Sequence, residues 1–297
     1  MIFELVKDLA KLALISACLY YALGVYVRRK RPAWSEPLEK RRLGILFVLV
    51  LAVSTIKLGE DVLGGESGPI DEMHVMARSG FDWLLIDMEH GPIDLASAHS
   101  MILATAGTSA VPMARIAANA PWLAKPLIDA GVLGIAVPMV CSKAEAEAAA
   151  RALRYPPSGE RMWGPFYAPM RWDMPMRDYM RAADEELLSI ITIEHADAVK
   201  RIDEIVEAHG VDVAIIGPGD LATSFGHHGQ IDHPDVQAAI REAERGILAS
   251  SITLGGVAFS PEQANRMIQT GYRIIALGFD WSLLQKGIAA AVSGIQR

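Results

Sequence analysis

The hydrophobic and polar positions of this chain follow two different patterns, and the second begins near residue 81. From there on, short apolar runs alternate with longer stretches of helical character, and the connections are short. A short apolar run closed by a turn signal is typical of a strand buried on both faces. Strands that alternate with helices predict parallel βα units. We expect strands at 82–87, 110–116, 133–138, 188–193, 212–216, 252–258 and 272–277.

The stretches between these runs are rich in Ala, Glu and Arg, which have high helix propensity. Gly80, Gly131, Gly210 and Gly271 each stand shortly before a predicted strand, where a left-handed helix cap is expected. Seven strands leave an eight-stranded barrel one short, and the only earlier candidate is the run at 46–53. The expected helices are 95–106, 122–130, 143–153, 176–183, 196–208, 234–250, 261–269 and 281–295.

The N-terminal region carries a different pattern. From Leu9 to Val27 the chain is apolar apart from Lys11, and basic residues follow at 28–31. This length suits a bilayer, and the basic cluster indicates the cytoplasmic flank. Because the positive charge follows the apolar run, a cleavable signal peptide fits less well. We predict a membrane helix and basic loop within residues 1–42, with a buried or interfacial helix as the alternative.

A second apolar run, Leu43 to Ile56, is short for a membrane span, for which about 20 residues are expected. Its segment 46–53 also reads as a buried strand, and its β-branched residues suit both interpretations. Residues 43–70 are therefore either a first barrel strand with a linker or a second membrane helix. Residues 71–297 form the predicted barrel domain.

Composition narrows the possible partners. Hydrophobic residues make up 52% of the 297, and the mean hydropathy of +0.25 is high for a soluble enzyme. A net charge of −7 provides no basic surface for nucleic acid, so we expect no nucleic-acid partner. Cys18 and Cys141 belong to no Cys-x-x-Cys motif, so neither a disulfide framework nor a structural zinc site is indicated.

Polar residues follow several predicted strands where each strand ends. Strand 82–87 leads to His90, strand 110–116 carries Arg115, strand 188–193 ends at Glu194, and strand 212–216 leads to Asp220. A barrel places its active site at this end of its strands. Glu194 and Asp220 are suited to a hard cation such as Mg²⁺. The alternative for each carboxylate is a cap of the helix that follows.

His90 is a candidate general base, although a lone histidine is also common in packing. A carboxylate bonded to the ring would fix its tautomer and raise its basicity. Asp129, at the end of the helix before the next strand, is the predicted partner. Arg115 can either pair with a carboxylate or stabilise an oxyanion.

A proline-rich loop with the aromatic stretch after it, and a set of further histidines, are the remaining candidates for a role in the site. The stretch from Tyr155 to Arg161, with two prolines and a glycine, predicts a rigid loop, and the aromatic-rich stretch 163–172 after it either covers a pocket or packs on the barrel. The remaining histidines lack a His-x-x-x-His face or a cysteine partner, so we do not expect them to form a transition-metal site. They are His195, His209, His227, His228 and His233.

Taken in order, the motifs resemble the HpcH/HpaI family of class II pyruvate aldolases from about Asp71 to the C-terminus. The resemblance implies a TIM barrel and a divalent metal, Mg²⁺ or Mn²⁺ and possibly Co²⁺. The implied reaction cleaves a 4-hydroxy-2-oxo acid to pyruvate and an aldehyde. The motifs are Asp87-x-Glu89-His90-Gly91, Arg115, Pro138-Met139-Val140, Tyr155-Pro156-Pro157-x-Gly159-x-Arg161, Ile193-Glu194 and Gly217-Pro218-x-Asp220-Leu221.

The resemblance also implies roles for individual residues. Glu194 and Asp220 would hold the metal, His90 would act as the base with Asp129 behind it, and Arg115 would stabilise the developing charge. Residues implied in substrate binding are Thr192, Gly219, Asp220 and Arg161. Thr192 stands where the family often has glutamine.

Two features outside the site follow from resemblance as well. Family members imply a homo-oligomer, a trimer or hexamer, in which C-terminal helices pack across subunits, as 281–295 could do. The segment 57–72 weakly resembles the membrane region of PAP2-type phosphatases, but none of that family's catalytic motifs follows it.

The membrane topology bears on the fold. An aldolase acting on cytosolic metabolites needs its barrel in the cytoplasm, which one span at 9–27 provides and two spans do not. We therefore predict a TIM (β/α)8-type barrel whose first strand is replaced by 46–53. The alternative function is an inactive, membrane-tethered barrel serving as a binding or scaffold module, because a barrel that lacks a strand exposes unpaired edges.

Overall fold

The computed structural model describes residues 46–51 and 69–295, which all belong to one compact unit, residues 42–297. The predicted membrane helix at 9–27 and the basic loop at 28–42 lie outside the described residues. Within 46–51 and 69–295, no helix combines the length and the hydrophobicity that crossing a bilayer requires.

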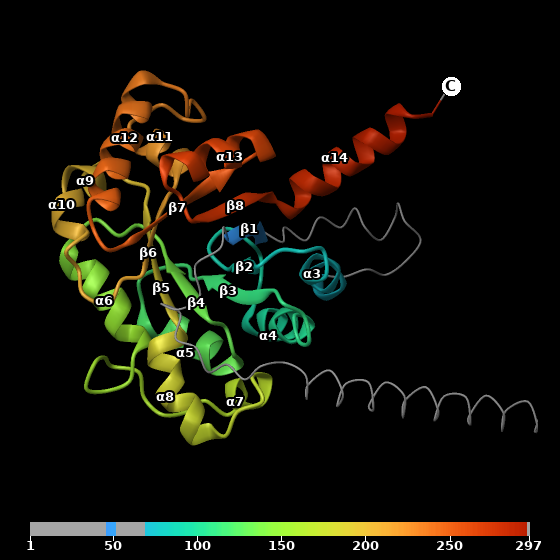
Figure 1. The fold of residues 1–297 in the computed structure, drawn as a ribbon, viewed down its shortest axis with the longest axis vertical. Helices are drawn as coiled ribbons and strands as arrows, with labels where there is room; N and C mark the ends of the chain where they lie inside the picture. The colour runs from blue at the N-terminus through green and yellow to red at the C-terminus, as the bar shows by residue number, and fades with distance from the viewer. Residues whose placement is uncertain (1–45, 52–68, 296–297) are drawn as a thin grey trace, which may run out of the picture. The chain divides into compact units, whose positions relative to one another are not determined.

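All seven strands predicted from residue 82 onward are confirmed, with ends that differ by at most two residues (Figure 1). Each strand pairs in parallel with its neighbours in sequence, so β2 to β8 form one curled parallel sheet. The strands are β2 (Trp83–Asp87), β3 (Val111–Arg115), β4 (Gly134–Val137), β5 (Leu188–Ile193), β6 (Val213–Ile216), β7 (Thr253–Ala258) and β8 (Ile274–Phe279).

The eighth position of the sheet is occupied by β1 (Leu46–Leu51). Its backbone pairs in parallel with β2, where Val48 lies opposite Trp83, and with β8, where Leu46 lies opposite Ile274. These two pairings close the sheet into a barrel of the TIM type. The prediction that the apolar run at 46–53 supplies the first strand is met over its described part.

Among the described residues, the eight helices predicted from residue 95 onward are all present, although 196–208 is broken into two short helices. Three further helices were not predicted: α3 (Pro69–Ala77), α7 (Ala168–Arg171) and α11 (Pro218–Ser224). α7 and α11 are too short to show a helical hydrophobic period. The others are α4 (Leu95–Ala104), α5 (Pro121–Ala130), α6 (Lys143–Leu153), α8 (Met176–Glu186), α9 (Ala196–Lys200), α10 (Ile202–Ile205), α12 (Pro234–Leu248), α13 (Pro261–Thr270) and α14 (Asp280–Ser293).

The apolar side chains of the strands divide into two buried clusters because neighbouring residues of a strand point to opposite faces. On β2, Leu84 and Ile86 belong to the cluster shared with the helices. Trp83 and Leu85 belong to a smaller cluster with Met113 of β3, inside the barrel. The interior is tightly packed, because a Cβ at Gly134 would lie 2.9 Å from the Met113 sulfur. A filled barrel leaves its chemistry to the strand ends.

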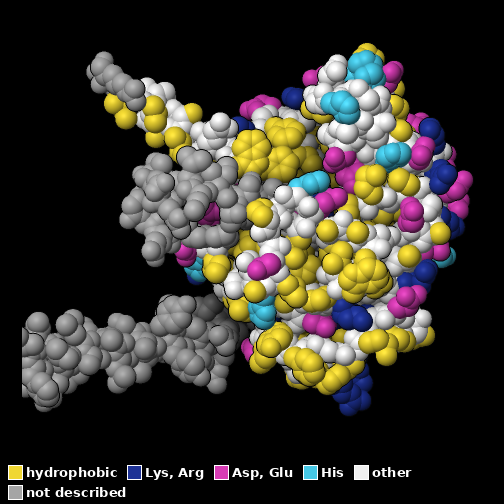
Figure 2. Space-filling view, turned by 180° about the vertical axis from the view of Figure 1, so that it is seen from behind, with side chains coloured by type: hydrophobic (Ala, Val, Ile, Leu, Met, Phe, Trp, Pro, Cys, Tyr) yellow, Lys and Arg dark blue, Asp and Glu magenta, His cyan; other side chains and the backbone are white. Residues whose placement is uncertain are grey.

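The last helix, α14, lacks the buried face that the other long helices have. None of its residues is buried, and several large apolar side chains on it are exposed, among them Leu284 at 54% and Ile288 at 50%. In Figure 1 this helix projects from the end of β8, and Figure 2 shows apolar side chains along its length. An apolar helix surface of this kind is typical of a protein–protein contact.

Candidate active site

Asp87, the last residue of β2, organises the turn that follows the strand. Its side chain is fully buried, and its Oδ1 accepts hydrogen bonds from the backbone N–H groups of Glu89 at 3.1 Å and His90 at 3.4 Å. A buried carboxylate that accepts from the backbone in this way fixes the conformation of the turn. The position of His90 at the end of β2 therefore depends on Asp87.

Arg115, at the end of β3, holds the two acidic residues of the β2 end together. Its Nε donates to Asp87 Oδ1 at 2.8 Å and its Nη2 donates to Asp87 Oδ2. Its Nη1 lies 3.2 Å from Glu89 Oε2. Burial favours the neutral guanidine, but the bonds to Asp87 and the charges of Glu89 and Glu194 outweigh it and raise the pKa of Arg115. This arginine therefore stays positively charged at the rim of the barrel, by which we mean the end where the carboxyl ends of the strands lie.

Glu89, in the turn after β2, also belongs to this cluster. Burial raises the pKa of its carboxyl, Arg115 partly offsets this, and the charge of Glu194 raises the pKa further. Two carboxylates that influence each other in this way lie close together. The ends of β2, β3 and β5 thus converge on one site, as the sequence predicted for the carboxyl ends of the strands.

His90 lies in the turn after β2 with an open side chain. The imidazole is 60% exposed, and its Nε2 lies 3.8 Å from Glu89 Oε2. This distance is too long for a hydrogen bond. The position of the imidazole is therefore determined by the backbone of the turn and not by a bond to a carboxylate. His90 is consequently accessible to a ligand at the rim.

Glu194, immediately after β5, carries a carboxylate that is 3% exposed. Its Oε1 accepts from the Thr192 hydroxyl at 2.6 Å and from the backbone N–H of Met139 at 2.7 Å. Among the described residues, no lysine, arginine or histidine forms an ion pair with it. A buried carboxylate is normally paired or bound to a metal, so the environment of Glu194 suits a cation.

Met139 contributes to the site through its backbone, which the residue pattern did not reveal. Its φ of 56° is left-handed, a conformation that is rare for a side chain of this size. The strained backbone aims the N–H at Glu194, and strain of this kind gathers at functional sites. The motif 138–140 was part of the family resemblance, but no residue type encodes the direction of an amide.

Asp220 and Gly219 lie in the first turn of α11, directly after β6, and both are exposed. The backbone brings this turn against Glu194, because a Cβ on Gly217 would lie 3.0 Å from Glu194 Oε2. Neither Glu194 nor Asp220 is the N-cap residue of a helix, because the N-cap of α9 is His195 and the N-cap of α11 is Gly217. The alternative role considered for Glu194 and Asp220 therefore does not apply.

Asp129 and Arg161 are brought together, which the sequence did not predict. Arg161 is fully buried and its Nη2 donates to Asp129 Oδ1 at 2.7 Å. No hydrogen bond or ion pair joins Asp129 to His90 among the described residues. The structure thus pairs Asp129 with Arg161 rather than with the imidazole, and it places Arg161 in the interior instead of at a substrate surface.

The surroundings of Arg161 are aromatic. Its guanidinium lies 4.5 Å from the centroid of the Tyr155 ring and 5.8 Å from that of Tyr179. Burial raises the pKa of Tyr155 to about 12, so this ring stays neutral. Cation–π contacts to two neutral rings supplement the single carboxylate partner of Arg161. The predicted rigid loop thus packs against the barrel through its arginine.

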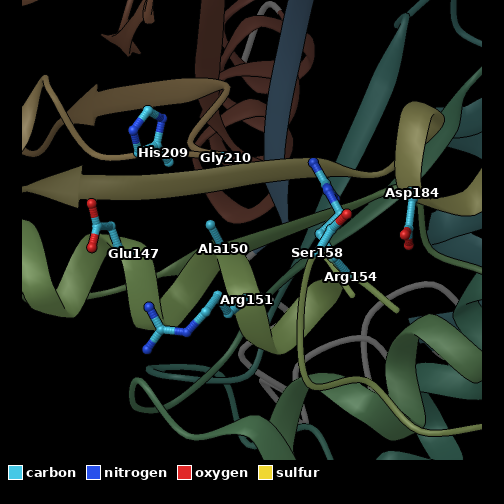
Figure 3. Close-up of a pocket in the computed structure, with 8 residues that line it drawn as sticks. All are labelled: Glu147, Ala150, Arg151, Arg154, Ser158, Asp184, His209 and Gly210. Atoms are coloured by element: carbon cyan, nitrogen blue, oxygen red, sulfur yellow. The ribbon is translucent and has the colours of Figure 1, made fainter. Parts of the chain in front are cut away.

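A cavity of about 410 Å³ lies away from this rim. Its walls include Asp184, which precedes β5, and His209 and Gly210, which precede β6. These residues stand at the amino ends of the strands, whereas barrel chemistry takes place at the carboxyl ends. We therefore assign the site to the rim and not to this cavity. Figure 3 shows the lining residues, which are Glu147, Ala150, Arg151, Arg154, Ser158, Asp184, His209 and Gly210.

The fold and the rim together define a parallel α/β barrel with carboxylates, an arginine and a histidine at the carboxyl ends of β2, β3, β5 and β6. The family model of HpcH/HpaI aldolase/citrate lyase matches residues 70–286. The chain belongs to this family, which confirms the predicted resemblance and the predicted lyase class at the family level. The resemblance of 57–72 to PAP2-type phosphatases finds no support in the comparisons.

Two curated relatives and one solved structure illustrate the similarity. A hydroxypyruvate/pyruvate aldolase of Pseudomonas aeruginosa is 36% identical over 236 residues, which are 78% of this chain and 88% of that protein. A 4-hydroxy-2-oxo-heptane-1,7-dioate aldolase of Klebsiella pneumoniae is 37% identical over 217 residues, 73% of this chain and 82% of that protein. The crystal structure of an HpcH/HpaI aldolase/citrate lyase family protein from Burkholderia cenocepacia aligns with a TM-score of 0.73 and 30% identity, covering 84% and 94% of the two chains.

Replacement of Thr192 by valine tests how Glu194 is held. The change removes the donor to Glu194 Oε1 but keeps the shape of the side chain. We predict that Glu194 is a metal ligand, and loss of a bond that orients such a ligand weakens metal affinity about 10–100-fold. Titration of Mn²⁺ into the metal-stripped protein measures this. Thr192→Ser retains the hydroxyl and is the matched control, and equal affinities for the two variants would contradict the assigned role.

Proposed function

We propose that the protein is a divalent-metal-dependent aldolase that cleaves a 4-hydroxy-2-oxo acid into pyruvate and an aldehyde. Family membership and the aldolase names of the relatives support this. The single observation that carries the proposal is the buried carboxylate of Glu194, which has two hydrogen-bond donors and no ion-pair partner within the described ranges.

The donor set at the ends of β5 and β6 fits a hard cation. Glu194 and Asp220 would supply carboxylate oxygens, and Mg²⁺ and Mn²⁺ prefer oxygen ligands, usually with one or two carboxylates and several waters. Co²⁺ is a further candidate. A divalent cation bound there would supply Lewis-acid polarisation of the substrate's carbonyl oxygen and stabilise negative charge that develops on it.

His90 and Arg115, two other residues of the rim, accept the proton and stabilise the negative charge that forms. His90 is exposed and removes the proton of the 4-hydroxyl group, directly or through a water. The C3–C4 bond then breaks, the aldehyde leaves, and the electron pair of that bond forms the enolate of pyruvate, which is protonated at C3. Arg115 retains its charge and offsets the negative charge of the enolate.

Substrate contacts are proposed for the exposed part of the rim. The space around Gly219 is open, since an added Cβ would meet no atom within 4 Å. Gly219 and Asp220 can therefore face a bound 2-oxo acid. Thr192 uses its hydroxyl on Glu194, so it serves this site by orienting a metal ligand, in contrast to the glutamine that the family often has there.

Removal of divalent metal is expected to abolish pyruvate release. The protein is dialysed against EDTA and then assayed with 4-hydroxy-2-oxo acids, with lactate dehydrogenase and NADH reporting pyruvate. Activity should return when Mg²⁺ or Mn²⁺ is added in excess. Turnover that persists in EDTA after exhaustive stripping would contradict the metal-dependent mechanism.

The alternative function, an inactive barrel used as a binding module, rested on an unfilled strand position. β1 pairs with both β2 and β8, so the barrel has no open edge there. The alternative function therefore loses the observation that motivated it, and we keep the aldolase function as our proposal.

We also propose that the protein is a homo-oligomer, a trimer or hexamer, assembled through α14. This helix has no buried residue of its own, and its exposed apolar side chains suit a second copy of the chain. Association with a membrane through residues 9–27 stays a prediction from the sequence, because that segment lies outside the described residues.

A further inference from the structure

A second group of potential metal ligands lies on the connection between α11 and α12, apart from the rim residues. It consists of His227, His233 and Asp235, whose ligand atoms all lie within 4.8 Å of one another. His227 Nε2 is 3.4 Å and His233 Nδ1 is 3.7 Å from the same oxygen, Asp235 Oδ2. The two imidazole rings are stacked with their centroids 3.5 Å apart. Two imidazoles thus converge on one carboxylate oxygen.

The backbone of the connection holds these residues in place. The N–H of Gln230 donates to the carbonyl of His227, and the N–H of His233 donates to the carbonyl of Gln230. Gly226 and Gly229, on either side of His227, have left-handed φ values of 78° and 72°, which side chains rarely adopt. This loop is therefore folded tightly enough to bring His227 back to His233 without any bound ion.

The distances agree with those between the ligands of one small ion. A tetrahedral zinc ion with bonds of 2.0–2.1 Å separates its ligand atoms by about 3.3 Å. The observed 3.4 and 3.7 Å from the histidine nitrogens to Asp235 Oδ2 need a small contraction. The stacked rings, which are 19° from parallel, also have to turn so that both nitrogens point at one ion. Imidazole nitrogens favour borderline transition metals over Mg²⁺, and a set of two histidines and one carboxylate leaves a fourth position for water.

The hydrogen bonding of His233 also suits a metal. His233 caps α12, and its Nδ1 accepts a hydrogen bond from the backbone N–H of Asp235 at 3.3 Å. That contact requires a free electron pair on Nδ1, which is the form that binds a metal. The cap bond is long and can be exchanged for a metal bond.

We propose that His227, His233 and Asp235 form a second metal site for Zn²⁺ or a similar transition-metal ion, separate from the site of Glu194 and Asp220. The ion joins the end of α11 to the first turn of α12. Since α11 begins with the turn that carries Asp220, the site stabilises the helix that positions this rim carboxylate. Figure 2 shows histidine side chains at the surface in this region, where an ion can enter from solvent.

Equilibrium dialysis of the full chain against Zn²⁺ tests the proposal. The protein is stripped with a chelator and carries Glu194→Gln, which disables the rim site, so that failure of the aldolase proposal does not affect the result. Excess Mg²⁺ is present to fill any remaining oxygen site. We expect one Zn²⁺ per chain, and Zn²⁺ should raise the melting temperature.

Variants of the three residues identify where the ion binds. In the same background, His227→Gln and Asp235→Asn should weaken Zn²⁺ binding at least about tenfold, since even outer-shell partners contribute that much. His233→Asn should do the same while it keeps a side chain that caps helices well. His228→Gln, which changes the exposed neighbour, is the matched control and should bind like its parent. Absence of bound Zn²⁺ in the parent, or undiminished affinity in His227→Gln, overturns the proposal.

Discussion

Replacement of His90 by alanine should lower kcat for cleavage of a 4-hydroxy-2-oxo acid by about 10²–10⁴-fold, the usual contribution of a general base. The ring is 60% exposed and the turn around it is fixed by Asp87 through backbone N–H groups. The substitution therefore removes the base without disturbing the turn. The metal ligands are untouched, so metal affinity should be unchanged.

The measurement is pyruvate release by the purified variant across a range of pH. His209→Ala is the matched control, because His209 is exposed and precedes β6, at the opposite end of the barrel. A His90→Ala variant with the kcat of the parent would exclude His90 as the base.

Removal of the Asp129 carboxylate is expected to destabilise the fold strongly. Arg161 is fully buried, and its Nε and Nη1 have no hydrogen-bond partner in the part of the chain that the structure describes. Asp129→Ala leaves a buried guanidinium without its counter-ion, and breaking a buried pair in this way costs about 3–5 kcal/mol. Contacts with Tyr155 and Tyr179 place the expected loss near the lower value.

The converse change should be milder. Arg161→Met keeps apolar contacts and leaves Asp129, whose side chain is 19% exposed, able to reach water. Urea unfolding of both variants and of the double variant gives the coupling between the two residues. The double variant should be more stable than Asp129→Ala alone. If Asp129→Ala unfolds at the urea concentration of the parent but alters the pH profile of kcat, then Asp129 acts on His90 as the sequence suggested.

The strands from 82 onward could be read from the sequence because both of their faces are buried. On β2, the side chains inside the barrel, Trp83 and Leu85, and those under the helices, Leu84 and Ile86, are all apolar. The strand is therefore a continuous run of apolar residues, whereas a helix with one buried face shows apolar residues only every three or four positions. The strand ends followed directly, and with them the positions of His90, Arg115 and Glu194.

The pairing of side chains could not be predicted in the same way. Asp129 was matched with His90 because both lie near the ends of neighbouring βα units, but the long loop after α6 inserts Arg161 beside Asp129. A buried guanidinium competes strongly for a carboxylate, and nothing in the residue pattern gives the path of such a loop. The role of Met139 was not predicted either, because this residue acts through its backbone N–H and not through its side chain.

The histidines after α11 show the limit of reading ligand spacing along the chain. His227 and His233 are six positions apart and have no cysteine partner, so they form neither the i, i+4 pair of a single helix nor a complete zinc-finger motif. Two left-handed glycines and two backbone hydrogen bonds return the chain on itself, so that the rings stack. Residues brought together by a loop in this manner are recognised only once the loop is seen.

The pairing of β1 with β8 has a consequence for biosynthesis. β1 leaves the ribosome before the other strands of the barrel, whereas its partner β8 leaves after them. During translation β1 can pair only with β2, and the ring has to wait for the C-terminal part of the chain to be made. Contacts between such distant segments form slowly, so we expect ring closure to be a late step in folding. A nascent chain stalled before β8 would therefore present a protease-sensitive, half-assembled sheet to chaperones.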